Sequence, residues 1–312
     1  MRKILAIDGG GIKGVFPASF LASVERDLRA PLASYFDLIV GTSTGGIVAL
    51  GLGAGVTASD ILRFYETKGP VIFGGNRVIR WLRQWASGKF DSLELEKALS
   101  EVFGTKRIGE SSVRLVIPSQ NLENGEVHIF KTAHHERFVK DYKLPMVTAA
   151  LATSAAPTYF PTYRAASGSP LIDGGTWANN PSAVAAVEAL GVLGWDPRDT
   201  LMLTISCTSS PVTARLARTY SMGRAYWAAK LMPILAAGQS SGALGMAQLL
   251  LGHDNIFRVD PHVEPGRFGL DKAVEIESLK GLGDSEARKA APHLQRFFEV
   301  PAEPFVPCHS IQ

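Results

Sequence analysis

The sequence predicts an α/β protein, and two stretches within its first fifty residues carry that prediction. Residues 3–7 form a compact apolar run that ends at a glycine loop, after which residues 15–28 show helical spacing. Residues 36–40 form a second apolar run, which leads through a glycine-flanked serine into the apolar stretch 47–50. Strand, glycine turn and helix therefore follow one another twice in succession.

Length and composition fit one large α/β domain, or such a domain with a cap. The chain has 312 residues, of which 46% are hydrophobic and 20% charged, which is enough for a sizeable core. A net charge of +3 is too small to indicate a DNA or RNA partner. The two cysteines, Cys207 and Cys308, lie far apart without metal-ligand spacing, so we expect reduced thiols, no metal and an intracellular protein. The apolar run after Met1 is too short for a signal-peptide core.

The serine turn, Gly41-Thr42-Ser43-Thr44-Gly45, has the G-x-S-x-G form of a nucleophile elbow. Such a turn strains the serine backbone and exposes its hydroxyl, while Gly41 and Gly45 let the strand and the following helix cross closely. The start of that helix directs free N–H groups at any negative charge that forms nearby. The pattern also occurs by chance, so the assignment of Ser43 depends on its companions.

The first turn, from Asp8 to Gly14, contains Gly9, Gly10 and Gly11 in succession and can present backbone N–H groups to a phosphate or an oxyanion. Its match to G-x-G-x-x-G makes a non-hydrolytic, nucleotide-binding Rossmann protein the main alternative. That alternative needs an acidic residue at the end of the next strand, whereas Asp37 precedes the apolar part of that strand, which ends on the serine turn. It predicts that a Ser43→Ala variant keeps its function.

A third turn with a candidate catalytic side chain follows residues 170–172, a short apolar strand that ends in Asp173-Gly174-Gly175. A carboxylate at the end of a strand, beside glycines that admit another backbone, is placed as a catalytic aspartate would be. Asp-Gly-Gly alone is an ordinary turn.

The segments between and after these turns predict the remaining elements. Residues 61–103 are mainly helical in pattern, with a cap signal at 91–94. An alanine-rich helix precedes Pro161, and a further helix starts at Asn179. The expected strands are 113–118, 127–132, 201–207 and 255–259, and a polar helix begins at 279.

We expect a catalytic core over residues 1–210 and a C-terminal helical cap or regulatory region, 211–312, packed on the same domain. The charge-free run 231–252 contains Pro233 and Gly238, which favour a buried or lid helix over a membrane span. Two arginine groups interleaved with aromatic residues could face a membrane or an anionic ligand, or could be solvated helix faces. They are Arg77, Arg80 and Arg83, and Arg215, Arg218 and Arg224.

Taken together, the glycine loop, the elbow, the segment 155–161 and Asp173-Gly174-Gly175 resemble a patatin-like phospholipase in order and spacing. The resemblance implies a three-layer α/β/α fold with a mostly parallel sheet, a Ser/Asp dyad without histidine and hydrolysis of lipid acyl esters. It implies that Ser43 is the nucleophile and Asp173 the general base. It also implies that Gly10 and Gly11, with Gly9, supply oxyanion N–H groups, and that no cofactor is needed.

A Ser-Asp-His triad of the α/β-hydrolase kind is the competing mechanism, because four histidines follow Asp173. They are His253, His262, His293 and His309. Several strands precede the elbow in that fold, whereas only one strand precedes the elbow's own strand here, so we expect these histidines to be surface or capping residues.

Some bacterial members of the patatin-like family are antiphage effectors that degrade the cell's own membrane when a cyclic oligonucleotide activates them. The resemblance therefore implies a phospholipid substrate at the membrane surface and a cyclic oligonucleotide activator. A cytoplasmic protein that becomes peripheral to the membrane when active fits the length and the basic, aromatic stretch 215–230.

Overall fold

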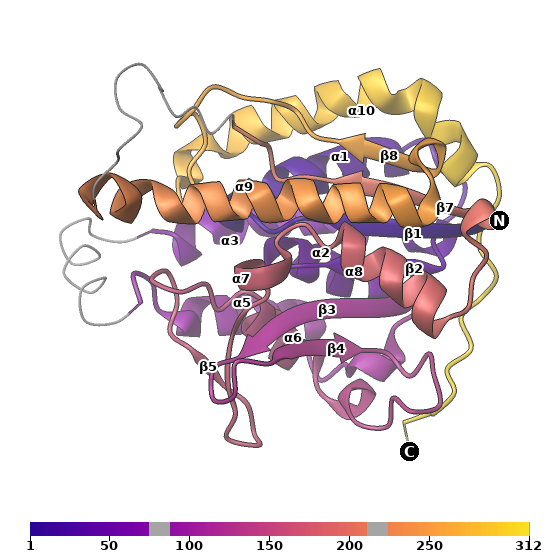
Figure 1. Ribbon diagram of the computed structural model, residues 1–312, viewed down its shortest axis with the longest axis horizontal. Coiled ribbons are helices and arrows are strands. Elements are labelled where there is room, and N and C mark those ends of the chain that lie inside the picture. The colour runs from indigo at the N-terminus through magenta and orange to yellow at the C-terminus, as the bar shows by residue number, and fades with distance from the viewer. Residues whose placement is uncertain (75–87, 211–223, 312) are drawn as a thin grey trace.

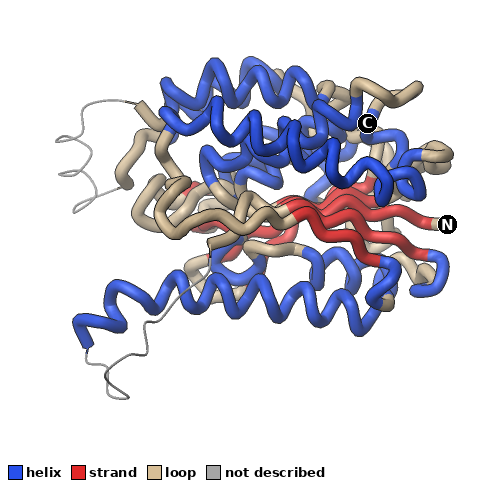
Figure 2. Tube along the Cα trace, turned by 90° about the horizontal axis from the view of Figure 1, so that it is seen from above, coloured by secondary structure: helices blue, strands red, loops and turns tan. Residues whose placement is uncertain are grey.

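The computed structural model of the protein describes residues 1–74, 88–210 and 224–311 (Figure 1). Within these residues the chain forms three layers, with helices on both faces of a central sheet, as the view from above shows (Figure 2). The predicted three-layer α/β/α class is confirmed.

The sheet is mixed, with a parallel core and an antiparallel edge. Five strands run parallel in the order β3, β2, β1, β7 and β8, and β4, β6 and β5 join antiparallel at the β3 side. The strands are β1 (Arg2–Ile7), β2 (Leu38–Gly41), β3 (Arg114–Asn121), β4 (Val127–Lys131), β5 (Tyr163–Arg164), β6 (Pro170–Asp173), β7 (Thr200–Ile205) and β8 (Ile256–Val259).

The central strands are apolar on both faces, because helices cover both. In β1, Leu5 and Ile7 belong to one core cluster, whereas Ile4 and Ala6 belong to the other. Successive side chains of a strand point to opposite faces, so a strand buried on both sides reads as an unbroken apolar run. This is why residues 3–7 and 36–40 were recognisable from the sequence.

The larger core lies under six helices on one face of the sheet. They are α1 (Val15–Glu25), α2 (Thr44–Gly53), α3 (Ala58–Ile72), α5 (Ser92–Phe103), α6 (Met146–Thr153) and α10 (Ile276–Phe298). Helices α1 and α10 pack closely: a Cβ added at Gly283 would lie 2.7 Å from the Phe16 carbonyl oxygen. The cap predicted at 91–94 is confirmed, because the Asp91 side chain accepts a hydrogen bond from the Leu93 N–H.

The opposite face carries α7 (Gly175–Ala178), α8 (Ser182–Val187), which a π-helical turn extends to Val192, and α9 (Arg224–Leu251). Ala243, Ala247 and Leu251 of α9 are buried, but most of this helix is on the surface. Burial, one half of the buried-or-lid interpretation of 231–252, is therefore wrong for most of this helix, and a lid role stays a prediction. Leu231–Leu251 is long and apolar enough to cross a membrane, a property that a single helix often has without doing so.

Two predicted helices end earlier than their patterns suggested. Helix α1 ends at Glu25 rather than Leu28, and α6 ends at Thr153 although the alanine-rich run continues. Pro157 disfavours helical backbone at the residue before it, so the chain turns after Ser154.

Beyond the predicted boundary at 210, β8 extends the same sheet and α10 the same core, and a regulatory role for that region stays a prediction.

Candidate active site

Ser43 occupies a strained turn between β2 and α2. Its φ of 56° and ψ of −123° are uncommon for a residue with a side chain, and such conformations cost about 1–3 kcal/mol. Two hydrogen bonds hold the turn: the Ser43 N–H donates to Thr153 Oγ1 at 2.9 Å, and the Ile47 N–H donates to the Ser43 carbonyl at 3.0 Å. The surrounding backbone thus fixes the serine where its hydroxyl faces away from the sheet interior.

The glycines of the elbow are there because backbone passes through the space that a Cβ would need. A Cβ at Gly41 would lie 2.1 Å from the Gly45 carbonyl oxygen, and one at Gly45 would lie 2.3 Å from the Ile7 carbonyl oxygen. Helix α2 can therefore start directly against the ends of β1 and β2 only with glycine at both positions.

Asp173 is the last residue of β6, which is separated from β2 by β3, and its carboxylate lies against the Ser43 hydroxyl. The Ser43 hydroxyl donates a hydrogen bond from Oγ to Asp173 Oδ2 at 2.6 Å. The other carboxylate oxygen, Oδ1, accepts from the Gly175 N–H at 2.6 Å, and Gly174 packs against the Pro118 carbonyl. Both members of the pair are buried, with 8% of Ser43 and 5% of Asp173 exposed.

The environment of Asp173 makes it a stronger base than an ordinary carboxylate. Burial raises its pKa from 3.8 to about 6, and the hydrogen bonds from Ser43 and Gly175 oppose that rise only in part. At neutral pH the group is still mostly ionised, so it can accept a proton from Ser43. Geometry and pKa together suit the pair to activating a serine hydroxyl.

The glycine loop lies beside this pair, but one of its N–H groups is already used. The Gly9 N–H donates to the Asn179 carbonyl at 2.9 Å, so Gly9 cannot be the oxyanion donor that the sequence suggested. A Cβ on Gly9 would lie 3.1 Å from Ser43 Cβ, so this glycine allows close approach instead. Within the described part of the chain, no hydrogen bond engages the N–H groups of Gly10 and Gly11.

Contacts with the C-terminal third fix the shape of the loop. Gly11 has a φ of +58°, and a Cβ there would lie 2.3 Å from the Leu270 carbonyl oxygen, which also accepts the Ile12 N–H at 2.9 Å. At the start of the loop, Asp8 accepts two hydrogen bonds from Arg258 of β8, at 2.6 and 3.3 Å. Such paired contacts between guanidinium and carboxylate are strong and orienting. The loop is therefore held from two sides.

Two further neighbours have structural roles. Cys207 is 2% exposed, and burial raises the pKa of its thiol to about 12, so it stays protonated and is a poor nucleophile. Gly14 packs against Thr44, the residue after the serine, and the Thr44 hydroxyl is hydrogen-bonded to the phenol of Tyr65 in α3. Burial raises the pKa of Tyr65, which keeps that phenol neutral.

The alternatives considered from the sequence find no support in the geometry. None of the seven histidines, all within the described residues, hydrogen-bonds to Ser43 or Asp173; His293, for example, stacks on Phe257. Asp37 lies before β2 and is engaged by the Lys3 N–H at 2.8 Å and by Arg2, so it cannot hold a ribose at the other end of the strand. In the same described part of the chain, no cluster of three or more acidic, His or Cys side chains could bind a metal.

Sequence reasoning missed three residues that support the site. Thr153 receives the Ser43 N–H and donates to the Pro118 carbonyl at 2.6 Å, Asn179 binds Gly9, and Tyr65 holds Thr44. A threonine inside the apolar run 149–156 was a signal for Thr153, but nothing local distinguishes the other two.

Five of the six arginines singled out lie outside the described residues: Arg77, Arg80, Arg83, Arg215 and Arg218. Arg224 begins α9, but its side chain is not described.

Comparison with known proteins gives consistent matches. A family described as patatin-like phospholipase matches residues 5–186. A cGAMP-activated phospholipase of Pseudomonas aeruginosa is 34% identical, over 92% of this chain and 88% of that protein. A protein of the same name from Vibrio cholerae is 31% identical, over 97% and 96%. Among solved structures, human GIVD cytosolic phospholipase A2 aligns with a TM-score of 0.47 and 10% identity, over 96% of this chain and 60% of that one.

Proposed function

Because this chain belongs to the patatin-like phospholipase family, we propose that it hydrolyses acyl esters of membrane phospholipids with Ser43 as nucleophile and Asp173 as general base. The observation that carries the proposal is the 2.6 Å hydrogen bond from Ser43 Oγ to the buried carboxylate of Asp173. A serine needs a base within hydrogen-bond reach, and a carboxylate with a raised pKa serves when it is shielded from water.

In this proposal Asp173 Oδ2 takes the hydroxyl proton as Ser43 Oγ attacks the ester carbonyl. The resulting oxyanion is stabilised by the N–H groups of Gly10 and Gly11 and by the amino end of α2. Asp173 then returns the proton to the departing lysophospholipid oxygen, which leaves an acyl-serine. Water attacks the acyl-serine while Asp173 takes its proton, and collapse of the second oxyanion releases fatty acid and restores the Ser43 hydroxyl.

We further propose that a cyclic nucleotide activates the enzyme, as the name of the two bacterial relatives states for them. An enzyme that attacks membrane lipids endangers the cell that makes it, so an activity that waits for a signal suits an antiphage effector. The cyclic nucleotide is then a regulator and takes no part in the chemistry of the dyad.

The outer face of α9 is proposed to bring the enzyme to the membrane. Leu235, Met246 and Leu249 are 55%, 54% and 83% exposed, and helical spacing places them on one stripe. The run from Leu231 to Leu251 contains no charged residue. Exposed apolar surface of this kind inserts favourably into the interfacial region of a bilayer.

The experiment that tests the proposed function measures fatty acid released from phospholipid vesicles by the wild type, Ser43→Ala and Asp173→Asn, each with and without cGAMP. We expect release by the wild type to increase with cGAMP and both variants to lose at least about a hundredfold in rate. Full release by Ser43→Ala would refute the assignment. Equal wild-type rates with and without cGAMP would refute the activation.

A further inference from the structure

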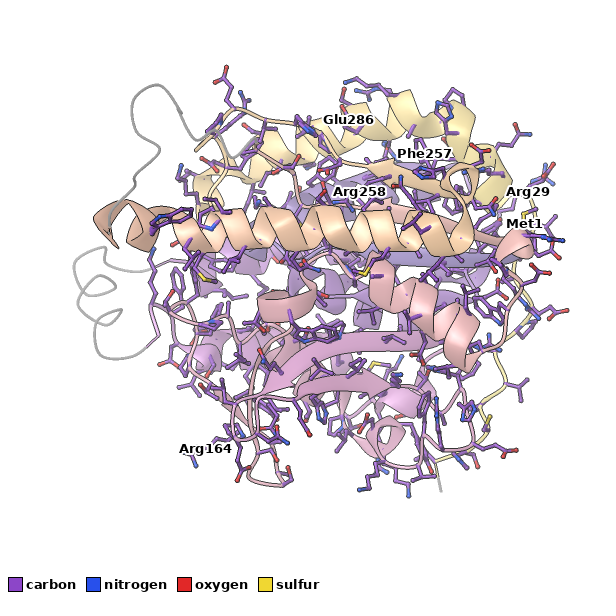
Figure 3. The ribbon with its side chains drawn as sticks, in the orientation of Figure 1. Met1, Arg29, Arg164, Phe257, Arg258 and Glu286 are labelled. Carbon is purple, nitrogen blue, oxygen red and sulfur yellow. The ribbon has the colours of Figure 1, made fainter. Side chains whose placement is uncertain are left out.

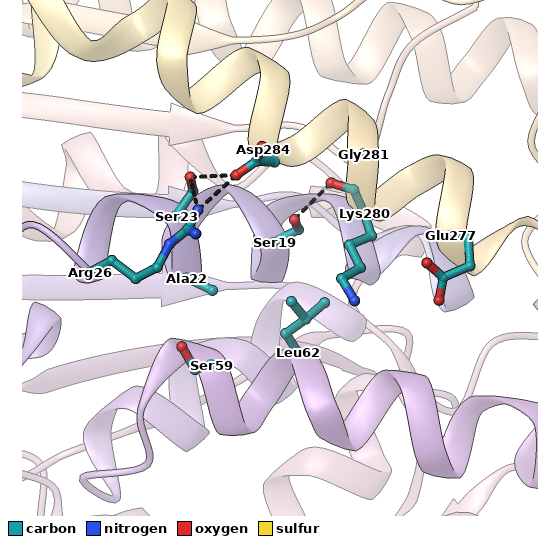
Figure 4. Close-up of a pocket in the computed structure, with 10 residues that line it drawn as sticks. All are labelled: Ser19, Ala22, Ser23, Arg26, Ser59, Leu62, Glu277, Lys280, Gly281 and Asp284. Carbon is teal, nitrogen blue, oxygen red and sulfur yellow. Dashed lines mark hydrogen bonds and ion pairs between the residues drawn. The ribbon is translucent and has the colours of Figure 1, made fainter.

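Two adjoining cavities lie in the helical layer on the far side of the sheet from α9. The smaller, about 400 Å³, is formed by α1, α3 and α10, and Figure 4 shows its lining. The larger, about 920 Å³, lies between residues 25–36, the start of α3 and residues 302–305 of the C-terminal tail. Arg26 and Ser59 line both cavities, so the two adjoin at these residues, and we refer to them as the two lobes of one groove.

The groove is lined by charges of both signs, with arginine the most frequent. The larger lobe carries Arg26, Arg29, Arg63 and Arg114 against Glu25, Asp60 and Glu303, and the smaller lobe carries Arg26 and Lys280 against Glu277 and Asp284. Several of these cations have acidic partners: Arg26 pairs with Asp284 at 2.7 Å, Arg63 with Asp60 at 3.1 Å, and Lys280 with Glu66. Arg29 forms no ion pair within the described residues, and Figure 3 places it at the end of the molecule that carries Met1.

Arg114 is a second cation of the larger lobe with capacity for a ligand. Its guanidinium lies 4.9 Å from the centre of the Phe305 ring and donates to the Asp37 carbonyl at 3.3 Å. Its Nε is buried without a hydrogen-bond partner in the described part of the chain. Buried polar donors are normally satisfied, and an unsatisfied one beside an open cavity is suited to a ligand acceptor.

From this arrangement we propose that the two-lobed groove binds the cyclic dinucleotide activator, an inference that rests on the activation proposed above. Two lobes joined at Arg26 fit a ring of two phosphates that carries two bases, and the half-buried Phe305 offers aromatic surface to a base. Arginine is the preferred residue for phosphate because its planar donors bind two oxygens at once. A phospholipid headgroup contains phosphate but no base, so it would leave the smaller lobe without an occupant.

The groove is connected to the active site by the helices that form it. Helix α1 runs from the groove at Ser23 to the glycine loop, a distance on the order of 10 Å at the rise of an α-helix. Helix α3 carries both Ser59, which lines the groove, and Tyr65. The Tyr65 phenol is hydrogen-bonded to Thr44, the residue after Ser43. Ser19 of α1 also donates to the Lys280 carbonyl of α10, at 2.8 Å. A ligand that displaces Asp284 from Arg26 would shift α1 against α10, and this movement would reach Gly10 and Gly11.

The test is calorimetric titration of the full chain with cGAMP, and with GMP and AMP, for the wild type and three variants. Arg29→Glu reverses an unpaired charge, and Ser59→Trp fills the junction of the lobes without a charge change. Arg198→Glu, an exposed arginine outside both lobes, is the matched control. We expect Arg29→Glu and Ser59→Trp to weaken cGAMP binding by about 10- to 100-fold while the control binds like the wild type.

The outcomes separate this proposal from the proposed function. If the wild type binds cGAMP and hydrolyses lipid but both groove variants bind cGAMP normally, the groove is refuted and the function stands. If the wild type hydrolyses lipid without binding cGAMP, the activator and its site both fail. If the variants lose sedimentation with phosphatidylglycerol vesicles and keep cGAMP binding, the groove is a lipid headgroup site and the proposal is overturned. Thermal melts check that each variant is folded. If Ser59→Trp does not fold, the cGAMP affinity of Arg29→Glu alone decides whether the groove is the binding site.

Discussion

Asp173 depends on its burial for the proposed role as general base, and that burial costs stability. Its pKa lies at about 6 in the folded chain against an ordinary value of 3.8, because the carboxylate has lost its water. Two further residues of the site are also costly to the folded state: the Ser43 backbone is strained, and the Gly10 N–H has no hydrogen-bond partner in the described structure. Active sites commonly store strain in this way.

The raised pKa predicts a pH profile. Above pH 6 Asp173 is ionised and can accept the Ser43 proton, so kcat/KM should rise through about pH 6 to a plateau. In Asp173→Asn the residual activity should show no such step, because the titrating group is gone. Rates of fatty acid release from pH 4.5 to 8 measure both profiles, and a wild-type rate unchanged across pH 6 would exclude Asp173 as the base.

The same shift predicts how stability depends on pH. Between pH 3.8 and 6 the folded chain binds more protons at Asp173 than the unfolded chain, so the free energy of unfolding falls as pH rises through that window. Above it the full cost is about 3 kcal/mol. Asp173→Asn should therefore be more stable than the wild type at pH 8, and the difference should vanish below about pH 4. Urea unfolding at both pH values checks this, and a variant less stable at pH 8 would contradict it.

The sequence indicated Ser43 and Asp173 because each ends a strand beside glycines, a pattern that local chemistry imposes. The same reasoning could not identify Thr153 or Tyr65, because their contacts with the elbow join positions that lie far apart in the chain. It also included Gly9 among the oxyanion donors, since whether an N–H is free depends on what packs against it, here the Asn179 carbonyl.

The glycine loop depends on Gly11 for both its backbone angle and its closeness to Leu270. Gly11→Ala adds a Cβ at a φ of +58° and places it 2.3 Å from a backbone oxygen. We expect kcat to fall by about tenfold to a hundredfold, since the loop must move and misplace its N–H donors.

Gly125→Ala is the matched control for Gly11→Ala. Gly125 has a φ of +73° but nothing within 4 Å of a Cβ, in a turn between β3 and β4. The control should cost about 1–2 kcal/mol of stability and leave kcat unchanged. If Gly11→Ala kept the wild-type kcat, the loop would not be an oxyanion hole.

Strands were easier to predict than helices in this chain. Every central strand is buried on both faces and so forms an apolar run, but helix ends depend on capping and on prolines such as Pro157. The exposure of α9 could not be predicted from its composition, because a buried core helix and a helix that contacts lipid can have the same apolar composition. The pairing of β8 with β7 likewise joins segments separated by about fifty residues.

The three layers give the molecule two faces, to which we assign separate roles. Helix α9 covers one side of the sheet and presents apolar side chains outward. The two-lobed groove lies on the other side, with its smaller lobe among α1, α3 and α10 and its larger lobe between residues 25–36, the start of α3 and residues 302–305. In the account proposed here the protein can therefore rest on a membrane through α9 and still receive a soluble ligand. Apart from Arg26 and Arg29, the groove arginines lie far apart in the sequence, so no local motif predicted the set.

Membrane contact through α9 predicts that Leu235→Glu combined with Leu249→Glu weakens binding to phospholipid vesicles. Burying a leucine contributes about 1.5–3 kcal/mol, so the loss should be at least tenfold. Val274→Glu is the control, since Val274 is 92% exposed and lies on the α10 side. Vesicle co-sedimentation measures the effect, and equal binding by the double variant and the control would place the membrane surface elsewhere.

The most direct test of the central claim is to find which residue a serine-directed fluorophosphonate modifies. We predict a single adduct, located by peptide mass spectrometry on Ser43, that forms more slowly in Asp173→Asn because the hydroxyl has lost its base. Loss of fatty acid release should parallel adduct formation in the wild type. An adduct on a different residue, together with undiminished lipid hydrolysis by Ser43→Ala, would contradict the account.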